Sequence, residues 1–225
     1  MKINLKQTKL FSKISKDTNQ IHLNKKFASK FFVKEPIVHG VNLAIFALSE
    51  FLKKKKKEIL IKSISLNFKN FISVNEKFKL SIFKDRIIIY NEFHTKLEIF
   101  LKYKTSLPKK QNLLKTKDSE KKFLKFKFKK LINFELIKQI IYSSYYVGSI
   151  NPGNGSLILN IKLDYNRNYC SKINPYVEKK IQNMRVISYQ ENFFKTQIIA
   201  CKLLTYKKQL KKLRFKSKTL NKLKN

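Results

Sequence analysis

A chain of 225 residues can bury about 70% of the surface that its unfolded form exposes, so it needs neither disulfides nor a structural metal to hold a core. Its 51 lysines and arginines against 14 acidic residues give a formal net charge of +37. A protein this basic is normally suspected of binding nucleic acid. Arginine, which phosphate and base recognition favours, is scarce, so we do not expect nucleic acid as a partner. The arginines are Arg86, Arg167, Arg185 and Arg214.

The remaining composition, rich in Lys, Ile, Asn, Phe and Tyr, is typical of coding drift in an AT-rich genome. The positive field has one functional alternative, which is attraction of an anionic substrate carrier such as coenzyme A or an acidic carrier protein. Cys170 and Cys201 form no CxxC pair, so we expect no disulfide framework, no metal and no cofactor. No stretch approaches the roughly 18 uncharged apolar residues of a membrane span, and we expect a cytoplasmic protein without a membrane partner.

The first half of the chain predicts one long helix and four strands. Asn24 is a good N-cap for a short helix over "KKFASKFF", which Glu35-Pro36 ends. Residues 40–53, "GVNLAIFALSEFLK", are apolar almost all round at helical spacing, which predicts a helix wrapped by a sheet. Runs rich in Ile, Phe and Tyr then predict strands over residues 59–71, 77–83, 86–93 and 96–103.

The same pattern restarts after a polar linker. Residues 105–122 contain Pro108 and lack periodicity, which marks a connector. Because the pattern occurs twice, the sequence predicts a duplicated α+β unit of about 100 residues, with two antiparallel sheets that pair edge to edge. The units are residues 1–104 and 123–206, and the basic tail 207–225 is either solvated or an amphipathic surface helix. The second unit has a predicted strand over 123–131, an apolar helix over 134–148, and strands over 156–165, 177–189 and 193–206.

One polar stretch, "FSKISKDTNQIHLN" (residues 11–24), carries the candidate chemistry. Asp17 and His22 are five positions apart, which is not a same-face helical spacing, and Thr18-Asn19 are poor residues for a helix interior. The stretch is therefore predicted to be a loop, in which the two side chains can converge on one point. There a carboxylate and an imidazole can orient a water molecule, take its proton and return one.

The surroundings of this pair resemble the signature of the MaoC-like, (R)-specific enoyl-CoA hydratase family. That signature is an aromatic residue, an aliphatic-Ser-Gly-Asp-x-Asn-Pro-aliphatic-His run, and then a small residue. Lys16 and Gln20 stand where the family has Gly and Pro. "PIVHG" at residues 36–40 is similar to the family's entry to its central helix. The matching residues are Phe11, Ile14, Ser15, Asp17, Asn19, Ile21, His22 and Ala28.

The resemblance implies a hot-dog fold, in which an antiparallel sheet wraps a long helix. It also implies reversible syn addition of water to a trans-2-enoyl thioester of CoA or a carrier protein, with a (3R)-hydroxyacyl product. Asp17 and His22 would hold and activate the water. The backbone N–H of Gly40, at the positive end of its helix, would stabilise the enolate-like thioester oxygen. Asn19 would brace the loop, and His39 would set the turn before Gly40.

The second half resembles a degenerate copy of this unit. Its "VGSINPGNGS" (residues 147–156) is similar to the turn that follows the hot-dog helix in the family. The half contains no histidine, and too few residues precede its helix to form a catalytic loop. We therefore expect a double hot dog of class α+β, with one active site per chain and a second half that makes space for the acyl chain. A homodimer is one conceivable assembly.

Two other functions stay open from the sequence. A hot-dog acyl thioesterase needs a carboxylate or a positioned water but not this Asp/His loop, and it would release a free thiol. A non-catalytic binder of nucleic acid or acidic partners would account for the charge, and its binding would weaken steeply with added salt if the field were nonspecific.

Overall fold

The computed structural model describes the chain except residues 32, 107–127, 129–130, 132, 171–173 and 206–225. The predicted tail 207–225 therefore lies outside the described residues. Of the predicted linker 105–122, Thr105 and Ser106 still belong to a strand, and the rest also lies outside them. Of the strand expected over 123–131, Phe128 and Leu131 are described and buried, and Leu131 forms an isolated bridge with Ile59.

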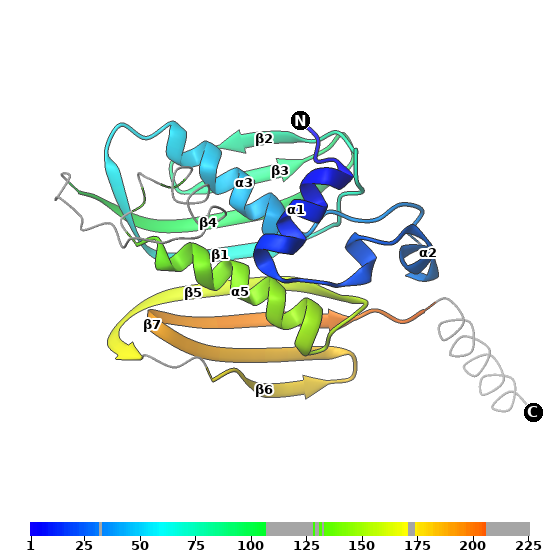
Figure 1. The fold of residues 1–225 in the computed structure, drawn as a ribbon. Helices are drawn as coiled ribbons and strands as arrows, with labels where there is room; N and C mark the ends of the chain where they lie inside the picture. The colour runs from blue at the N-terminus through cyan, green and yellow to red at the C-terminus, as the bar shows by residue number, and fades with distance from the viewer. Residues whose placement is uncertain (32, 107–127, 129–130, 132, 171–173, 206–225) are drawn as a thin grey trace, which may run out of the picture.

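Seven strands of the described chain form one antiparallel sheet (Figure 1). They are β1 (Glu58–Phe68), β2 (Lys79–Ile82), β3 (Arg86–Tyr90), β4 (Thr95–Ser106), β5 (Ser156–Cys170), β6 (Tyr176–Ile181) and β7 (Met184–Lys202). Their spatial order is β2-β3-β4-β1-β5-β7-β6, so the first half supplies one side of the sheet and the second half the other. The halves join where β1 pairs with β5, from Ser63 opposite Asp164 to Asn67 opposite Asn160. The predicted edge-to-edge pairing is confirmed.

Two helices lie side by side on the same face of this sheet (Figure 1). The first, α3 (Gly40–Lys53), matches the predicted residues 40–53 and buries nine of its fourteen residues. Each fully buried Leu, Ile or Phe contributes about 1.5–3 kcal/mol, so contact on several sides, rather than helix propensity, holds α3 in place. The second, α5 (Glu135–Tyr145), continues into a π-helical turn, η3 (Tyr146–Ile150), and confirms the helix expected over 134–148.

Four shorter helical segments precede α3 and lie at one end of the sheet (Figure 1). They are α1 (Leu5–Ser15), η1 (Gln20–His22), α2 (Lys25–Ala28) and η2 (Ser29–Phe31). Asn24 caps α2 as predicted, because its side-chain oxygen accepts the backbone N–H of Phe27. Residues 11–24 are not one loop, contrary to the prediction: residues 11–15 form the end of α1, whose start is fixed by a capping box between Asn4 and Gln7. Residues 16–19 are the connecting loop between α1 and η1.

The strand boundaries of the second half differ from the predicted ones. The chain turns at Gln182 and Asn183, where Gln182 adopts a φ of 48°, so β6 and β7 replace the single strand expected over 177–189. β7 then passes through the polar residues Gln190–Asn192, which the sequence suggested as a break. Asn192 has a φ of 51°, and the pairing of β7 with β5 is irregular there. A bulge therefore absorbs the polar residues without ending the strand.

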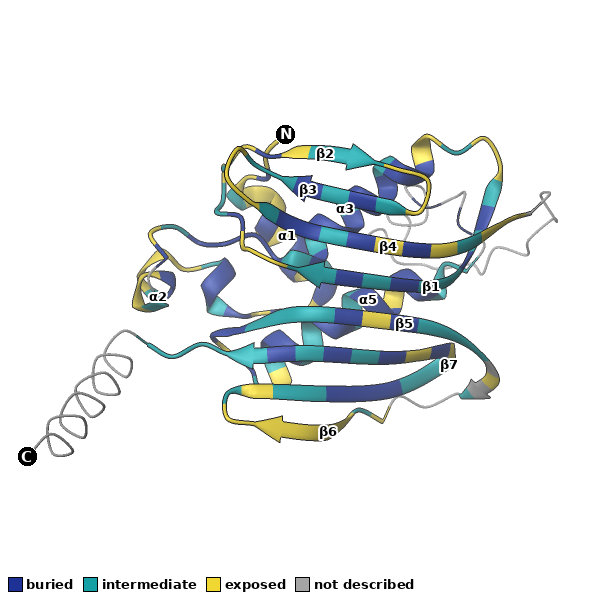
Figure 2. Ribbon diagram, turned by 180° about the vertical axis from the view of Figure 1, so that it is seen from behind, coloured by how far each residue is buried: buried dark blue, intermediate teal, exposed yellow. Residues whose placement is uncertain are grey.

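One hydrophobic core runs through both halves, between the sheet and its two helices (Figure 2). In β3, for example, Ile87 and Ile89 are buried while their neighbours are half-exposed, the alternation expected of a sheet with one covered face. Strand β6 lies at the edge of the sheet and is exposed along its length (Figure 2). In the described residues, no helix has the length and hydrophobicity needed to cross a membrane.

Candidate active site

The loop between α1 and η1 brings Asp17 into the interior of the protein. Lys16, which ends α1, has a φ of 60° and a ψ of 17°, in the left-handed region that favours glycine. Lysine at this position costs about 1–2 kcal/mol, yet the turn is made. Ser12 Oγ donates to the Asp17 carbonyl at 2.5 Å, and the Asp17 N–H donates to Ser15 Oγ at 3.2 Å. The carboxylate consequently lies at 3% exposure.

Both carboxylate oxygens of Asp17 accept hydrogen bonds. The backbone N–H of Asn19 donates to Oδ1 at 3.1 Å, and the hydroxyl of Ser144 on α5 donates to Oδ2 at 2.7 Å. Burial raises the pKa of Asp17 above its ordinary value, while His22 and the two hydrogen bonds act in the opposite direction. The residue is thus a desolvated carboxylate whose charge depends on these donors.

His22, at the end of η1, is buried and held by one hydrogen bond. Its Nδ1 lies 2.9 Å from the carbonyl oxygen of Ile37. Because a carbonyl can only accept, Nδ1 carries the proton and Nε2 keeps its lone pair in the neutral ring. Burial lowers the pKa of His22, although Asp17 and the Ile37 carbonyl oppose this shift. The ring is therefore neutral at physiological pH, with a basic nitrogen available.

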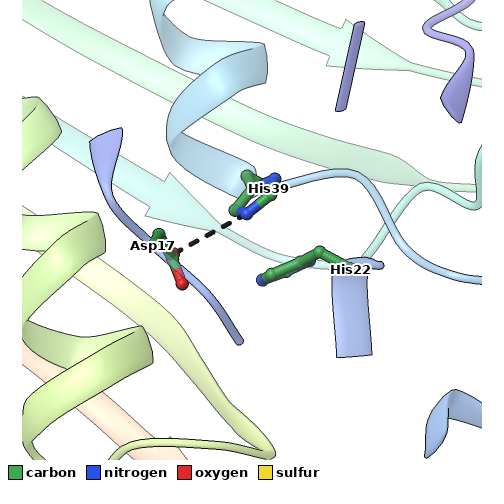
Figure 3. Close-up of side chains that lie close together, drawn as sticks. All are labelled: Asp17, His22 and His39. Carbon is green, nitrogen blue, oxygen red and sulfur yellow. Dashed lines mark ion pairs between the residues drawn. The ribbon is translucent and has the colours of Figure 1, made fainter. Parts of the chain in front are cut away.

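His39, immediately before α3, completes a compact group with Asp17 and His22 (Figure 3). The two histidine rings stack with their centroids 3.8 Å apart and their planes at 29°. His39 Nε2 lies 3.8 Å from Asp17 Oδ2. Burial holds the pKa of His39 well below its ordinary value, His22 lowers it further, and the Asp17 backbone carbonyl opposes the shift. His39 was predicted to set the turn before Gly40. In the structure its side chain also faces the Asp17 carboxylate.

A cavity of about 160 Å³ connects this group to the start of α3. Asp17, His22, His39 and Gly40 all line it. As the first residue of α3, Gly40 has a backbone N–H without an acceptor inside the helix, at the positive end of the helix dipole. The Phe68 ring packs against Gly40 so closely that a Cβ there would lie 2.7 Å from it, and any larger residue would collide.

Within the described residues, one group of side chains is arranged so that it could hold a metal ion: Asp17, His22 and His39. Their ligand atoms all lie within 4.8 Å of one another. However, the lone pairs of an imidazole lie in the ring plane, and these two rings are stacked at 29°. Their nitrogens point along nearly parallel planes and not toward a shared centre. The arrangement suits proton transfer better than metal binding.

Comparison with known proteins identifies the first half. The family model described as a MaoC like domain matches residues 1–97. A search of curated protein sequences gives no significant match.

One solved structure extends the likeness in fold beyond residues 1–97 to most of the chain. A protein described as a MaoC-like dehydratase superposes with a TM-score of 0.57 and 4% identity, over 91% of this chain and 95% of its own. At so low an identity the likeness shows the fold alone, which is the double hot dog expected from the sequence. HtdX from Mycobacterium tuberculosis (TM-score 0.47, 6% identity, 91% of this chain and 97% of its own) and acyl-CoA thioesterase II TesB2 from Mycobacterium marinum (TM-score 0.46, 8% identity, 72% and 88%) are also similar, at lower TM-scores.

The second half supplies contacts that the MaoC-like domain lacks by itself. Asn19 of the loop donates through Nδ2 to the carbonyl of Ser156 at 2.9 Å and accepts the Gly155 N–H at 2.8 Å. The helical turn after α5 also packs directly on the carboxylate, because a Cβ on Gly148 would lie 2.0 Å from Asp17 Oδ1. The loop is thus held against "VGSINPGNGS" of the histidine-free half, in addition to the Ser144 hydrogen bond.

Ser144 and Gly148 are the residues that sequence analysis missed. A signal for one of them existed, since Gly148 is among only four glycines of the chain and three of these fall within residues 148–155. The cluster was attributed to a turn, and Gly153 and Gly155 do have φ values of 78° and 76°. Gly148 is different: its φ is ordinary, and glycine is required there by the close approach of Asp17.

Proposed function

We propose that this protein is a hydro-lyase of acyl thioesters, which reversibly hydrates trans-2-enoyl-CoA or the corresponding carrier-protein thioester to the (3R)-hydroxyacyl product. The observation that carries the proposal is the convergence of Asp17, His22 and Gly40, the first residue of α3, on one cavity. The match of residues 1–97 to the MaoC like domain model supports the substrate class.

The acid–base chemistry is assigned to Asp17 and His22. A water molecule held between the carboxylate and His22 Nε2 attacks C3 of the enoyl group, and Nε2 takes the proton that the water loses. The carboxylate stabilises the imidazolium that forms. That imidazolium then returns the proton to C2 on the same face, so the net result is addition of H and OH across the double bond. General acid–base assistance of this kind contributes roughly 10²–10⁴ in rate.

The thioester oxygen is assigned to the start of α3. As water adds to C3, negative charge moves to that oxygen, and the Gly40 N–H together with the helix dipole stabilises it. One such donor is worth roughly 10²–10³ in rate.

The residues around the pair keep it in the required state. The fixed Nδ1–H of His22 leaves Nε2 as the base, because the Ile37 carbonyl accepts only a proton donor. Ser144 and the Asn19 N–H favour the ionised form of Asp17 against the effect of burial. We therefore assign Ser144 and Asn19 as positioning residues for Asp17.

The test is an assay of purified protein with crotonyl-CoA and longer enoyl-CoA and enoyl-carrier-protein thioesters, followed by loss of the conjugated enoyl absorbance and by the chirality of the product. Asp17→Asn and His22→Ala should each lower kcat at least about a hundredfold. His94→Ala, at an exposed position on the β3–β4 turn, is the control and should keep full activity. Undiminished turnover in either site variant would contradict the mechanism, and release of free thiol without hydration would identify a thioesterase instead.

A further inference from the structure

His39 is buried more deeply than either proposed catalytic side chain, at 1% exposure against 3% for Asp17 and 6% for His22. Within the described residues, neither of its ring nitrogens has a partner at hydrogen-bonding distance and angle, although the Asp17 backbone carbonyl acts electrostatically on the ring. A neutral imidazole carries one donor and one acceptor, and burying both without partners is unfavourable. A phenyl ring would fill the same space without this cost. An imidazole at this position therefore needs a polar partner that the resting geometry does not fully supply.

Asp17 is the best placed partner. The separation of 3.8 Å between His39 Nε2 and Asp17 Oδ2 exceeds the 2.7–3.2 Å of an N–H···O hydrogen bond. It is also too short for an intervening water, which would need two such bonds in series. A relative shift of about 0.8 Å would make the direct bond. Hydrogen bonds in catalytic sites are commonly long before substrate binds and tighten in the complex.

His39 also fixes the ring of His22. The two rings stack at 3.8 Å, and Phe11 packs on His39 with a centroid separation of 4.9 Å. The Ile37 carbonyl sets which nitrogen of His22 is protonated, whereas stacking sets the plane in which its free nitrogen points. Contact with both catalytic groups distinguishes His39 from a residue that only shapes the turn before Gly40.

We propose that His39 is a positioning residue of the active site, which donates its Nε2–H to Asp17 Oδ2 when the site closes on substrate and keeps His22 in plane. His39 keeps its proton in this hydrogen bond, so no proton is transferred to Asp17. This inference rests on the proposed function only for its effect on turnover. Burial keeps His39 neutral, so it supplies a donor without adding charge beside His22.

The other titratable groups of the cavity do not substitute for this donor. Among the described residues, Lys69 and Lys96 are the lysines that line it. Lys96 is paired with Glu76 at 3.0 Å and donates to the Phe71 carbonyl at 3.1 Å. Lys69 lies 3.8 Å from Glu98 and has half of its side chain exposed. Neither cation has a recorded contact with the Asp17 carboxylate.

The experiment measures the pKa of Asp17 directly, by carbon-13 NMR titration of its carboxyl group in the full chain. His39→Phe keeps a stacking ring but removes the donor, and His39→Gln restores an N–H donor without a ring. His94→Phe is the matched control at an exposed histidine. We expect the pKa of Asp17 to rise by about one unit in His39→Phe, a tenfold change in ionisation, to recover in His39→Gln, and to stay unchanged in His94→Phe.

Turnover gives the second readout. The same loss of donor should lower kcat/KM for enoyl hydration by roughly ten- to hundredfold, the scale of a hydrogen bond to a charged group, and shift the acidic limb of the pH profile upward. An Asp17 pKa that is unchanged in His39→Phe overturns the proposal. So does an equal loss of turnover in His39→Phe and His39→Gln without any shift of that pKa. If the wild-type protein hydrates no enoyl thioester, the proposed function fails, while the NMR titration still decides the contact.

Discussion

Gly148→Ala is the sharpest single test of where the second half meets the proposed catalytic loop. The change adds one methyl group at a position of ordinary φ, so the backbone itself should accept alanine. The new Cβ would lie 2.0 Å from Asp17 Oδ1, 2.5 Å from its Cγ and 2.7 Å from Oδ2. Real Cβ contacts essentially never fall below 3.0 Å, so the carboxylate must retreat by about 1 Å.

This displacement sets the expected size of the effect. A misplacement of about 1 Å in a catalytic group costs on the order of a hundredfold in rate. Overpacking of a tight site also costs about 1–3 kcal/mol of folding free energy. Because Asp17 is held by Ser144 and Asn19, it cannot move without stretching hydrogen bonds that favour its ionised form. We therefore expect kcat to fall about a hundredfold, with only a modest decrease in the thermal unfolding temperature.

The assay compares kcat, KM and thermal unfolding of Gly148→Ala with those of Ile140→Val. Ile140 is fully buried on the same helix, and its shortening removes one methylene group at a cost of about 0.5–1.5 kcal/mol. This control matches the loss of stability without touching the carboxylate, and it should retain its turnover at temperatures where it is folded. Wild-type kcat in a folded Gly148→Ala protein would refute the claimed contact between the turn and Asp17.

Three further predictions concern the groups around the cavity. Ser144→Ala should raise the pKa of Asp17 and move the acidic limb of the pH–rate profile to higher pH, with a roughly tenfold or greater loss of kcat/KM at acidic pH; an unmoved limb would contradict it. Lys96→Met removes the charged partner of Glu76, whose carboxylate keeps only the neutral donors of Ser73 and Asn91. The change should cost about 1–3 kcal/mol in urea unfolding, less than for a fully buried pair because Glu76 is partly exposed; recovery in the double variant with Glu76→Gln is expected, and no recovery would argue against the pair. The folded-state pKa of His39 lies well below its ordinary value of 6.5. As pH falls below 6.5, His39 therefore binds a proton in the unfolded chain but not in the folded one, and the free energy of unfolding decreases. His39→Phe should therefore lose less stability than wild type between pH 7 and 5.5, by up to about 1.4 kcal/mol per pH unit below 6.5, and parallel urea-unfolding curves would contradict this.

Much of the fold was predictable because its signals are local. Residues 40–53 are apolar at helical spacing and form α3 over those same residues. The four strands of the first half follow their Ile- and Phe-rich runs to within a few residues. The polar run Gln190–Asn192 misled the prediction. Strand β7 pairs with β6 up to Ser188 and with β5 from Asn192 onward, and these pairings on both sides carry the strand through residues that would favour a turn in isolation. Tertiary pairing overrode local preference there.

The candidate site was predictable only in part, for a similar reason. Asp17, Asn19 and His22 stand in one short motif, so the sequence alone could suggest that they act together. Ser144 lies 127 positions from Asp17, and nothing local distinguishes its hydroxyl from that of Ser143. Which of the two faces the carboxylate is decided by the rotation of α5 against the loop. That rotation depends on packing across both halves, which no short sequence pattern encodes.

The hydrogen bonds that cross from "VGSINPGNGS" to the Asp17–His22 loop have a consequence for how this protein tolerates change. A half without histidine would be expected to accept substitutions freely once it has no chemistry of its own. Here the Ser144 hydroxyl binds the other half's carboxylate, and the Gly155 N–H binds Asn19 of the same loop. The lack of a side chain at Gly148 leaves room for that carboxylate. Substitutions between residues 144 and 156 should therefore register first as lost turnover and only later as lost folding, so each half limits how far its neighbour can diverge.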